Sequence, residues 1–538
     1  MKILSLLLFL VLKCALCDVL SLGDGGSKEW IQRLPFAEGS TIIYTWTNFA
    51  MKDFLFNFIM NLKRLGITNF VVGALDQPTF DYMEEVAGRL DMRIPVLNLH
   101  SNLTTGDYGW NSHSFKLMAK YKFESVCHLL EAGYESWVFD TDVAILENPL
   151  DYGKRFPVPD ILISTDTLRR APLNQQIHST LNIGMMLLRP KSAKFVRNFY
   201  QTMIEHPEFG KGLWDQGLWN DMVRKEARHS SDDYLTMNDG LKIQALDILD
   251  FSNGQVFFVQ KLHEKLNHKT IAVHATFQFG GSVGKRHRYR EAMIWHDEEA
   301  YYDVPVLSYT NEIPADLLAK SSYSVEDHFE LMNFQIVQLR NAWAIGRSLG
   351  RRLVLPELFS GFDRAWFTSF LGNGSGTGVF PGSDPLFTLP IRGIPADHVL
   401  DFEMLDKLHL MDELREYSFL QNSRTPKHMI DDVIYAGFKS RDVDITLKSF
   451  SSSDDLKKQL ASRNMHKRLH LRDVPIYAFS KFSDSTEQNA FHELMRTLGG
   501  IWCCAKSHVW YDMLYPQYPH RDRHGRMYKQ WEIRYGDN

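Results

Sequence analysis

The first half of the chain alternates short apolar runs with longer segments in which apolar residues recur every three or four positions. The short runs are rich in β-branched and aromatic residues, which predicts strands. The longer segments predict helices that pack on those strands. The predicted order is a strand at 41–47, a helix at 54–65, a strand at 69–75, a helix at 79–90, a strand at 94–99, a helix at 112–130 and a strand from Ser136.

Strands that are apolar along nearly their whole length are typical of a parallel sheet with helices on both faces. We therefore predict an α/β fold, with a mostly parallel sheet in this half of the chain. Ligands of such sheets bind beyond the carboxyl ends of the strands. Thr47, Asp76 and Asp140 each follow or end a predicted strand on that side. We expect these three side chains to lie along one edge of the sheet.

The second half of the chain predicts another α/β domain. Residues 304–325 contain Pro305, Pro314 and a serine pair, and are predicted to be a linker. The domains are therefore expected at 41–303 and at 326–538. The elements expected in the second are helices at 333–349, 403–420 and 453–469, and strands at 352–356 and 474–478.

The composition is that of a folded globular protein of more than one domain. A chain of 538 residues is too long for a single ordinary core. Apolar residues make up 44% and charged residues 23%, which excludes a disordered chain. The net charge of −5 gives no indication of a nucleic-acid partner.

Residues 1–17 have the pattern of a secretory signal peptide. Lys2 precedes an apolar run of about ten residues, and small residues at Ala15 and Cys17 offer a cleavage point. The run is shorter than the roughly 20 apolar residues of a transmembrane helix. A short uncleaved signal anchor is the alternative, and only then would the protein be held at a membrane. The secretory pathway is the expected location.

The segment from Ser136 to Leu146 is apolar except for Asp140, Thr141 and Asp142. Alternate residues of a strand point the same way, so the two carboxylates are predicted to converge where a buried strand ends. Two carboxylates held that close repel each other unless a cation lies between them. Mn²⁺ or Mg²⁺ fits that need, usually with substrate phosphates as further ligands. An Asp-x-Asp pair alone also occurs in helix caps and turns.

Two further segments place polar side chains beside buried elements. Asn182 and Gly184 lie at the start of an apolar strand, where the amide can bind a ligand and the glycine permits close backbone approach. A turn before a core strand is the alternative. Asp215 and Gln216 lie among tryptophans, and this combination suits a sugar, whose ring packs on aromatic faces and whose hydroxyls bind polar groups. An Asp215 side chain that caps a helix is the alternative there.

A histidine precedes a glycine-rich, basic segment near the end of the first half. His274 is predicted to be the third ligand of the metal held by the two aspartates. Gly284 would let backbone amides approach a diphosphate, and Lys285 would neutralise its charge. The alternative is a core histidine followed by a solvated basic helix. Lys116 and Lys120 share one face of the predicted helix 112–130, which precedes the strand with the two aspartates. Either could reach the site, although a solvated helix face also explains them.

The segment from Trp137 to Pro149 resembles the metal motif of the nucleotide-diphospho-sugar transferase family, which includes plant arabinosyltransferases of cell-wall extensins. Asp76, then Asn182 to Met186, then Asp215 with Gln216 follow in the order that this family shows. His274 to Gly280 and Gly284 to Ala292 are similar to the extensin arabinosyltransferases in particular. The likeness is strong over residues 41–303. It extends more loosely to His328–Pro356 and Trp502-Cys503-Cys504.

The resemblance implies a Rossmann-like glycosyltransferase-A domain that uses a UDP-sugar donor and Mn²⁺ or Mg²⁺, and that retains the anomeric configuration. It implies that Asp140, Asp142 and His274 hold the metal. It also implies that Asp215 and Gln216 lie near the anomeric carbon. The residues expected to contact the nucleotide sugar are Thr47, Asp76, Lys120, Asp140, Thr141, Asn182, Gly284 and Lys285.

The expected reaction is transfer of a sugar, arabinose favoured, to a hydroxyl of a glycoprotein or oligosaccharide in the Golgi lumen. A hydroxyproline-rich acceptor follows from the resemblance alone. Galactosyl or xylosyl transfer is the alternative within the same fold, and a secreted carbohydrate-binding protein with an inactive site is the alternative outside it. Attack from the side of the leaving group and a covalent intermediate on Asp215 both stay open. The second domain is expected to be accessory and to bind acceptor, and its likeness to protein O-fucosyltransferases leaves a second active domain as the alternative.

Overall fold

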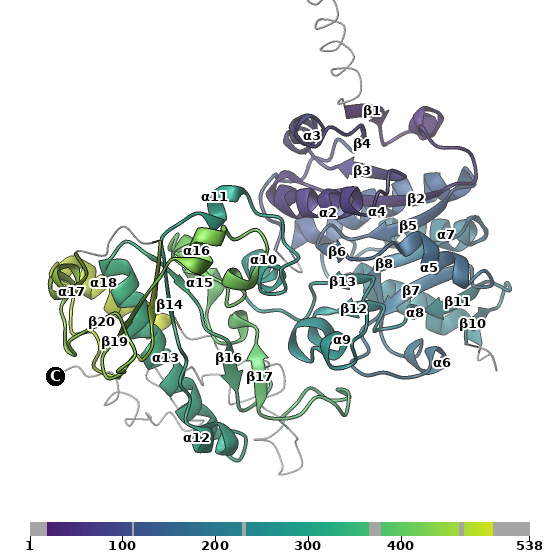
Figure 1. The fold of residues 1–538 in the computed structure, drawn as a ribbon. Coiled ribbons are helices and arrows are strands. Elements are labelled where there is room, and N and C mark those ends of the chain that lie inside the picture. The colour runs from purple at the N-terminus through teal and green to yellow at the C-terminus, as the bar shows by residue number, and fades with distance from the viewer. Residues whose placement is uncertain (1–18, 110–111, 229–232, 365–377, 462–466, 499–538) are drawn as a thin grey trace, which may run out of the picture. The chain divides into compact units, whose positions relative to one another are not determined.

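The chain forms two compact units in the computed structural model (Figure 1). Unit 1 comprises Met1–Phe257 and Lys261–Thr276, and unit 2 comprises Phe258–Gln260 and Phe277–Asn538. The structure describes residues 19–109, 112–228, 233–364, 378–461 and 467–498. The predicted signal peptide at 1–17 and the Cys503-Cys504 pair lie outside these ranges. Within them, no helix has the length and the apolar character needed to cross a bilayer.

Unit 1 is built on a large sheet in which the parallel strands predicted from the sequence lie side by side. Strands β1, β4, β3, β2 and β5 are parallel neighbours, and antiparallel β8 separates them from β7 and its parallel neighbour β11. Two short antiparallel strands complete the edge. In sheet order the bounds are β1 Val19–Asp24, β4 Ile94–Asn98, β3 Phe70–Ala74, β2 Thr41–Thr47, β5 Glu135–Phe139, β8 Leu181–Leu188, β7 Ile161–Thr165, β11 Lys242–Ala245, β10 Leu235–Met237 and β9 Ala227–Arg228.

Helices cover both faces of this sheet because alternate strand residues point to opposite sides. In β5, Trp137 and Phe139 join the core on one face while Val138 joins the core on the other. The helices that pack on the Trp137 side are α2 Lys52–Arg64, α3 Gln77–Leu90 and α5 Pro149–Arg155, and those on the Val138 side are α4 His113–Glu131, α7 Ala193–Glu205 and α8 Asp215–Glu226. The predicted parallel sheet with helices on both faces is confirmed.

A small second sheet of unit 1 positions the segment after β5. It contains β12 Phe251–Asn253, β13 Ala272–His274 and β6 Val143–Ile145. Strand β6 follows the two aspartates and pairs antiparallel with β13, in a register that sets His274 opposite Val143. Strand pairing therefore brings His274 next to Asp142 from more than a hundred residues away. The short helices α6 Leu173–Gln176 and α9 Leu262–Lys265 complete the unit.

The core of unit 1 contains a neutral histidine, His128 on α4. Trp30 donates its indole N–H to His128 Nδ1 at 3.3 Å, so that nitrogen carries no proton. Burial lowers the pKa of His128 to about 4, and the nearby cation Arg197 adds to the effect. The unfolded chain, with a histidine pKa of about 6.5, takes up the proton first as the pH falls. His128 therefore stabilises unit 1 above pH 6.5, and this contribution is lost as the pH falls towards 4.

We expect the free energy of unfolding to fall by about 3 kcal/mol between pH 7 and pH 4 through His128 alone. Urea unfolding at both pH values measures the loss. His128→Gln has no titrating ring, so its free energy of unfolding should fall by about 3 kcal/mol less than that of the wild type over this pH range. The control His100→Gln, at an exposed position, should lose as much stability as the wild type. An equal pH dependence in the wild type and His128→Gln would contradict the assignment.

Unit 2 contains a six-stranded sheet whose strands are all parallel. Its strands in sheet order are β18 Leu414–Arg415, β15 Arg352–Val354, β14 Val306–Tyr309, β21 Arg468–Leu471, β19 Val433–Gly437 and β20 Ile445–Thr446. A separate pair contains β16 Leu358–Ser360 and β17 Ile391–Ile394. The helices are α10 Gly281–Glu291, α11 Glu299–Tyr302, α12 Ala315–Lys320, α13 Val325–Ser348, α15 Phe402–Lys407, α16 Lys427–Asp431, α17 Ser453–Leu460 and α18 Ser485–Thr497. The predicted second α/β domain is confirmed.

The boundary between the two units differs from the predicted linker. Residues 304–325 hold β14 and α12, and β14 lies in the middle of the unit 2 sheet. The strand Val306–Tyr309 has only four residues, which is a weak strand signal in the sequence. The nearby Pro305 and Pro314 favoured a linker instead. Unit 2 already begins at Phe277.

Three element predictions in unit 2 are wrong in part. The helix expected at 403–420 ends at Lys407, and His409 then takes a left-handed backbone with φ 57°. Leu414–Arg415 instead forms β18, an edge strand with two buried residues that pairs with β15. The helix expected at 453–469 ends at Leu460, and the strand β21 starts at Arg468. Residues 474–478 form a turn closed by Ala478 N–H and Pro475 O, because a proline has no N–H for a sheet.

Candidate active site

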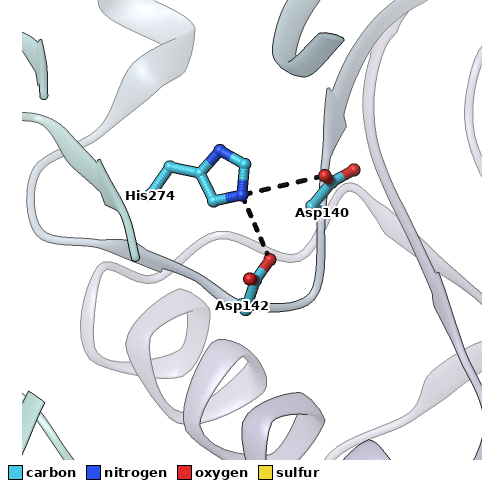
Figure 2. Close-up of side chains that lie close together, drawn as sticks. All are labelled: Asp140, Asp142 and His274. Carbon is cyan, nitrogen blue, oxygen red and sulfur yellow. Dashed lines mark ion pairs between the residues drawn. The ribbon is translucent and has the colours of Figure 1, made fainter. Parts of the chain in front are cut away.

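Three side chains of types that can bind a metal converge just beyond the carboxyl end of β5. His274 Nε2 lies 3.3 Å from Asp142 Oδ1 and 3.8 Å from Asp140 Oδ2 (Figure 2). One ligand atom from each residue lies within 4.8 Å of those of the others. The side chains of Asp142 and His274 are about nine-tenths buried, whereas Asp140 is 29% exposed. The cluster is thus open on the side of Asp140.

The two aspartates converge through a turn rather than through the alternation of a strand. Strand β5 ends at Phe139, and Asp140 to Asp142 turn the chain into β6. Val143 N–H donates to Asp140 O, and Asp140 N–H donates to Gly184 O of β8. The three side chains lie close together as expected. The turn after β5 and the pairing of β6 with β13 bring them together, rather than the alternation of a single strand.

The residues fit a hard divalent cation. Two carboxylates and one imidazole match the donor preference of Mn²⁺ or Mg²⁺, and the remaining positions of the ion would be left to phosphate or water. Gly184 leaves the space that such a cluster needs. A Cβ at this position would lie 2.3 Å from His274 Cε1 and 2.9 Å from Asp140 Oδ2.

We expect Gly184→Ala to displace the His274 ring and to weaken Mn²⁺ binding by about tenfold or more. The Mn²⁺-induced rise in melting temperature measures this loss. Gly88→Ala is the matched control, because a Cβ at Gly88 on α3 meets nothing within 4 Å. An unchanged Mn²⁺-induced rise in melting temperature in Gly184→Ala would mean that Mn²⁺ binding does not depend on the position of the His274 ring.

A buried lysine on α4, Lys122, contacts this cluster. Its ammonium group donates to Asp140 Oδ1 at 3.1 Å and to Ile183 O at 2.7 Å, and the side chain is 2% exposed. The group also lies 4.5 Å from the centre of the Trp46 ring. The sequence contained a signal for this residue. Lys122 lies four residues after Met118 and four before Val126, within the apolar stripe of the helix.

A second polar cluster lies around Asp166, which directly follows β7. Its carboxylate accepts from Asn182 Nδ2 at 3.0 Å and from Gln216 Nε2 at 3.3 Å. Burial raises the pKa of the Asp166 carboxyl, and the hydrogen bond from Asn182 opposes that shift. Asn182 Oδ1 in turn accepts the N–H of Gly184. The sequence analysis missed Asp166, although it follows an apolar strand just as Asp140 does.

Asp215 and Gln216 begin α8 beside these clusters. Asp215 is the first residue of the helix, and its Oδ1 accepts the Gln216 N–H at 2.9 Å. The alternative of an N-cap does not hold, since Trp214 occupies that position. Burial raises the pKa of the Asp215 carboxyl, whereas the charge of Lys122 lowers it and the charge of Asp140 raises it further. Asp215 therefore interacts electrostatically with the Asp140–Lys122 pair.

The other predicted contacts to the nucleotide sugar occupy the same sheet edge but have structural partners. Asp76 caps α3, and its carboxylate accepts the N–H groups of Thr79 and Phe49. Thr141 donates its hydroxyl to Trp46 O at 2.6 Å. Thr47 is buried at the end of β2. The role of each in binding a nucleotide sugar stays a prediction.

The predicted lysines Lys116 and Lys120 do not join the cluster through any contact in the described ranges. Lys116 donates to Lys211 O, and the Lys120 ammonium lies 5.5 Å from the centre of the Tyr121 ring. Both are off the apolar stripe of α4 on which Lys122 lies. The geometry thus favours Lys122 over Lys120 as the lysine of this site.

Gly284 and Lys285 belong to α10 of unit 2. A Cβ at Gly284 would lie 2.1 Å from Phe279 O, so the residue allows a tight first turn of the helix. The basic run after Lys285 is not a solvated face throughout. Arg288 is fully buried and pairs with Asp397 at 2.9 Å, and that carboxylate also accepts the Phe279 N–H. The predicted diphosphate contacts of Gly284 and Lys285 stay predictions.

Comparison with known proteins identifies relatives along most of the chain. Arabinosyltransferase XEG113 of Arabidopsis thaliana is 30% identical over 527 residues, which cover 89% of this chain and 77% of the relative. Residues 65–289 match the model of the nucleotide-diphospho-sugar transferase family. The chain belongs to this family. It is therefore a glycosyltransferase, and the expected glycosyltransferase-A fold of unit 1 is confirmed together with the second α/β unit.

A second relative and one solved structure complete the comparison. Beta-arabinofuranosyltransferase RAY1 of Arabidopsis thaliana is 26% identical over 220 residues, which cover 40% of this chain and 39% of the relative. The crystal structure of mouse xyloside xylosyltransferase 1 matches 44% of this chain and 98% of its own, at 11% identity and a TM-score of 0.28.

Proposed function

We propose that this glycosyltransferase uses a divalent metal, Mn²⁺ or Mg²⁺, to transfer a sugar from a UDP-sugar to a hydroxyl of a glycoprotein or glycan. One observation carries the proposal. Asp140, Asp142 and His274 form a cluster of metal-ligating atoms at the carboxyl end of a parallel sheet. Ligands of such sheets bind at that edge.

The chemistry follows from the charges that change in the reaction. Departure of the diphosphate leaves an oxocarbenium-like sugar, and a metal held by these three residues supplies a Lewis acid for the leaving oxygens. Lys122 fixes Asp140 by its hydrogen bond, and Asp166 holds the Gln216 amide. Asp215 and Gln216 would thus present a carboxylate and an amide to the sugar.

Retention of the anomeric configuration belongs to the proposal. Two routes lead to it. In the first, the acceptor hydroxyl attacks from the side of the departing phosphate and gives its proton to that phosphate. In the second, the Asp215 carboxylate would attack the anomeric carbon as UDP leaves and form a covalent glycosyl intermediate. The acceptor hydroxyl would then displace that carboxylate and give its proton to the phosphate of UDP. Proton NMR of the first product formed distinguishes retention from inversion.

The sugar proposed is arabinose, because the relatives that match the chain are named arabinosyltransferase and beta-arabinofuranosyltransferase. The acceptor proposed is a glycoprotein, for which a hydroxyproline-rich one is the first candidate, and the location proposed is the Golgi lumen. Galactose and xylose are the alternatives for the sugar. A panel of UDP-sugars, with release of UDP as the readout, decides among them. Release should be fastest with the arabinose donor and should stop with EDTA.

An inactive carbohydrate-binding protein is the alternative outside catalysis. Glycan binding that is insensitive to EDTA, with no release of UDP from any donor of the panel, would support it and would overturn the proposed transferase. Release of UDP from galactose or xylose donors alone would keep the reaction and replace the sugar.

A further inference from the structure

Two loops of unit 2 follow strands of its parallel sheet on the carboxyl side. Loop 447–452 follows β20, and loop 474–480 comes shortly after β21. From β14 the chain adds β15 and β18 on one side of the sheet and its later strands on the other side. The topological switch point therefore lies between β14 and its neighbour β21. Ligands of open parallel sheets bind beyond the carboxyl ends at such a switch point. Loop 474–480 therefore lies where a ligand of unit 2 is expected, and loop 447–452, which follows the edge strand β20, is hydrogen-bonded to it.

These loops present two exposed aromatic rings that stack on each other. Phe450 is 64% exposed and Tyr477 is 55% exposed. Their ring centres are 5.0 Å apart, with an angle of 15° between the ring planes. Large aromatic side chains are usually buried, whereas both rings of this pair are more than half exposed although they stack. We call Phe450 and Tyr477 the aromatic platform.

The backbone beneath the platform is held in place. The buried Asn341 of α13 donates from Nδ2 to Ile476 O at 3.1 Å, and its Oδ1 accepts the Phe479 N–H at 3.1 Å. The two loops also bind each other, because Phe450 N–H donates to Tyr477 O at 2.8 Å. None of these bonds uses an aromatic side chain. The rings can therefore be replaced without removing a hydrogen bond of the loops.

Phe450 adopts a backbone conformation that disfavours its side chain. Its φ of 58° lies in the left-handed region, where a bulky residue is an outlier. Such strain is found at binding sites, where the surrounding structure enforces it. Here it coincides with a phenylalanine that is exposed rather than packed.

We propose that the aromatic platform binds a short neutral oligosaccharide, the glycan part of the acceptor. The choice of a glycan rests on the proposed function of unit 1. One face of a sugar ring carries C–H groups of weakly positive charge, which fit the electron-rich face of an aromatic ring. The exposed Ser449 directly precedes Phe450, and the exposed Ser480 lies three residues after Tyr477, so both loops also carry a hydroxyl that a sugar can bind.

The size of the platform favours a glycan over a protein partner. A stable protein interface uses about 20 to 30 residues on each side. The apolar surface here consists of two rings and the exposed Ile476, which is 53% exposed. The exposed Lys448 and Lys481 lie in the chain within four residues of the two rings. One to three sugar units match that area.

The test measures binding of neutral tetrasaccharides to the full chain in EDTA and without nucleotide. Under these conditions, binding that depends on the metal site of unit 1 does not contribute to the signal. Fragments of arabinan, galactan and xylan are the probes, and saturation-transfer NMR with titration calorimetry is the readout. We expect at least one probe to bind. Phe450→Ala and Tyr477→Ala should each weaken its affinity by about tenfold, since each removes one stacking face.

Two controls separate stacking from a change of fold. Tyr477→Phe keeps the ring and should bind like the wild type, and Tyr323→Ala removes a tyrosine that is 72% exposed elsewhere in unit 2 and should also bind like the wild type. Binding that survives both alanine substitutions, or no binding of any probe, would overturn the proposal. So would a proline-rich peptide or a second copy of the chain that binds in place of the glycans.

Release of UDP from the donor without acceptor distinguishes this proposal from the proposed function. It should be equal in the wild type and Phe450→Ala. Glycan binding that needs the platform in a protein that releases no UDP would keep the platform and refute the transferase. Normal UDP release with no glycan binding would refute the platform alone.

Discussion

Asp142→Asn is expected to lower sugar transfer by roughly a thousandfold while the protein stays folded. The substitution preserves the size of the side chain but removes the charge that a divalent ion needs at this position. It also turns an acceptor that faces His274 Nε2 at 3.3 Å into an amide. The measurement is the initial rate of transfer at saturating donor, with circular dichroism to verify the fold.

The control for this prediction is Asp151→Asn on α5. Asp151 is 70% exposed and pairs only with the exposed Lys154 in the contacts described, so its charge should not affect the rate. Full transfer activity of folded Asp142→Asn would show that the aspartate does not hold the metal. The cluster with Asp140 and His274 would then be a structural feature of the turn after β5.

Lys122→Met is expected to destabilise unit 1 by about 2 kcal/mol in the absence of metal and to slow transfer by about tenfold or more. The buried ammonium group is the counter-charge of Asp140, and it also interacts with Asp215. Methionine fills the space against Trp46 but leaves the carboxylates to repel each other and Ile183 O without its donor. Thermal unfolding with and without Mn²⁺ measures the effect.

Mn²⁺ should stabilise Lys122→Met more than it stabilises the wild type, because the ion then supplies the charge that the lysine had provided. Lys154→Met is the control, since its ammonium is exposed and pairs with an exposed carboxylate. A Lys122→Met protein with wild-type stability and wild-type rate would refute the role of the lysine in orienting Asp140.

The sheet of unit 1 was predictable because its strands are apolar along their whole length and its helices are amphipathic. Residues 41–47 form β2 with the predicted bounds, and the other predicted strands agree to within about a residue. Unit 2 was harder. The strand β18 has only two residues, and Leu410, Met411 and Leu414 have a spacing that also suits a helix. Only the pairing with β15 decides its structure.

The cluster of Asp140, Asp142 and His274 was predictable in its members but not in its geometry. Asp140 and Asp142 converge through a turn, and His274 reaches them through the pairing of β6 with β13, a long-range contact that no local pattern contains. Lys122 and Asp166 were missed for a different reason. Each carries a local signal: Lys122 lies within an apolar stripe, and Asp166 directly follows a strand. Neither belongs to one of the sequence motifs from which the site was predicted.

The most direct test of the central claim is a thermal shift with UDP, with and without Mn²⁺, on the wild type and on Asp140→Ala. A ligand that binds only the native state raises the melting temperature. We predict that UDP raises the melting temperature of the wild type only when Mn²⁺ is present, and that Asp140→Ala loses this rise. A rise that is independent of Mn²⁺, or equal in Asp140→Ala, would contradict a nucleotide-metal site formed by Asp140, Asp142 and His274.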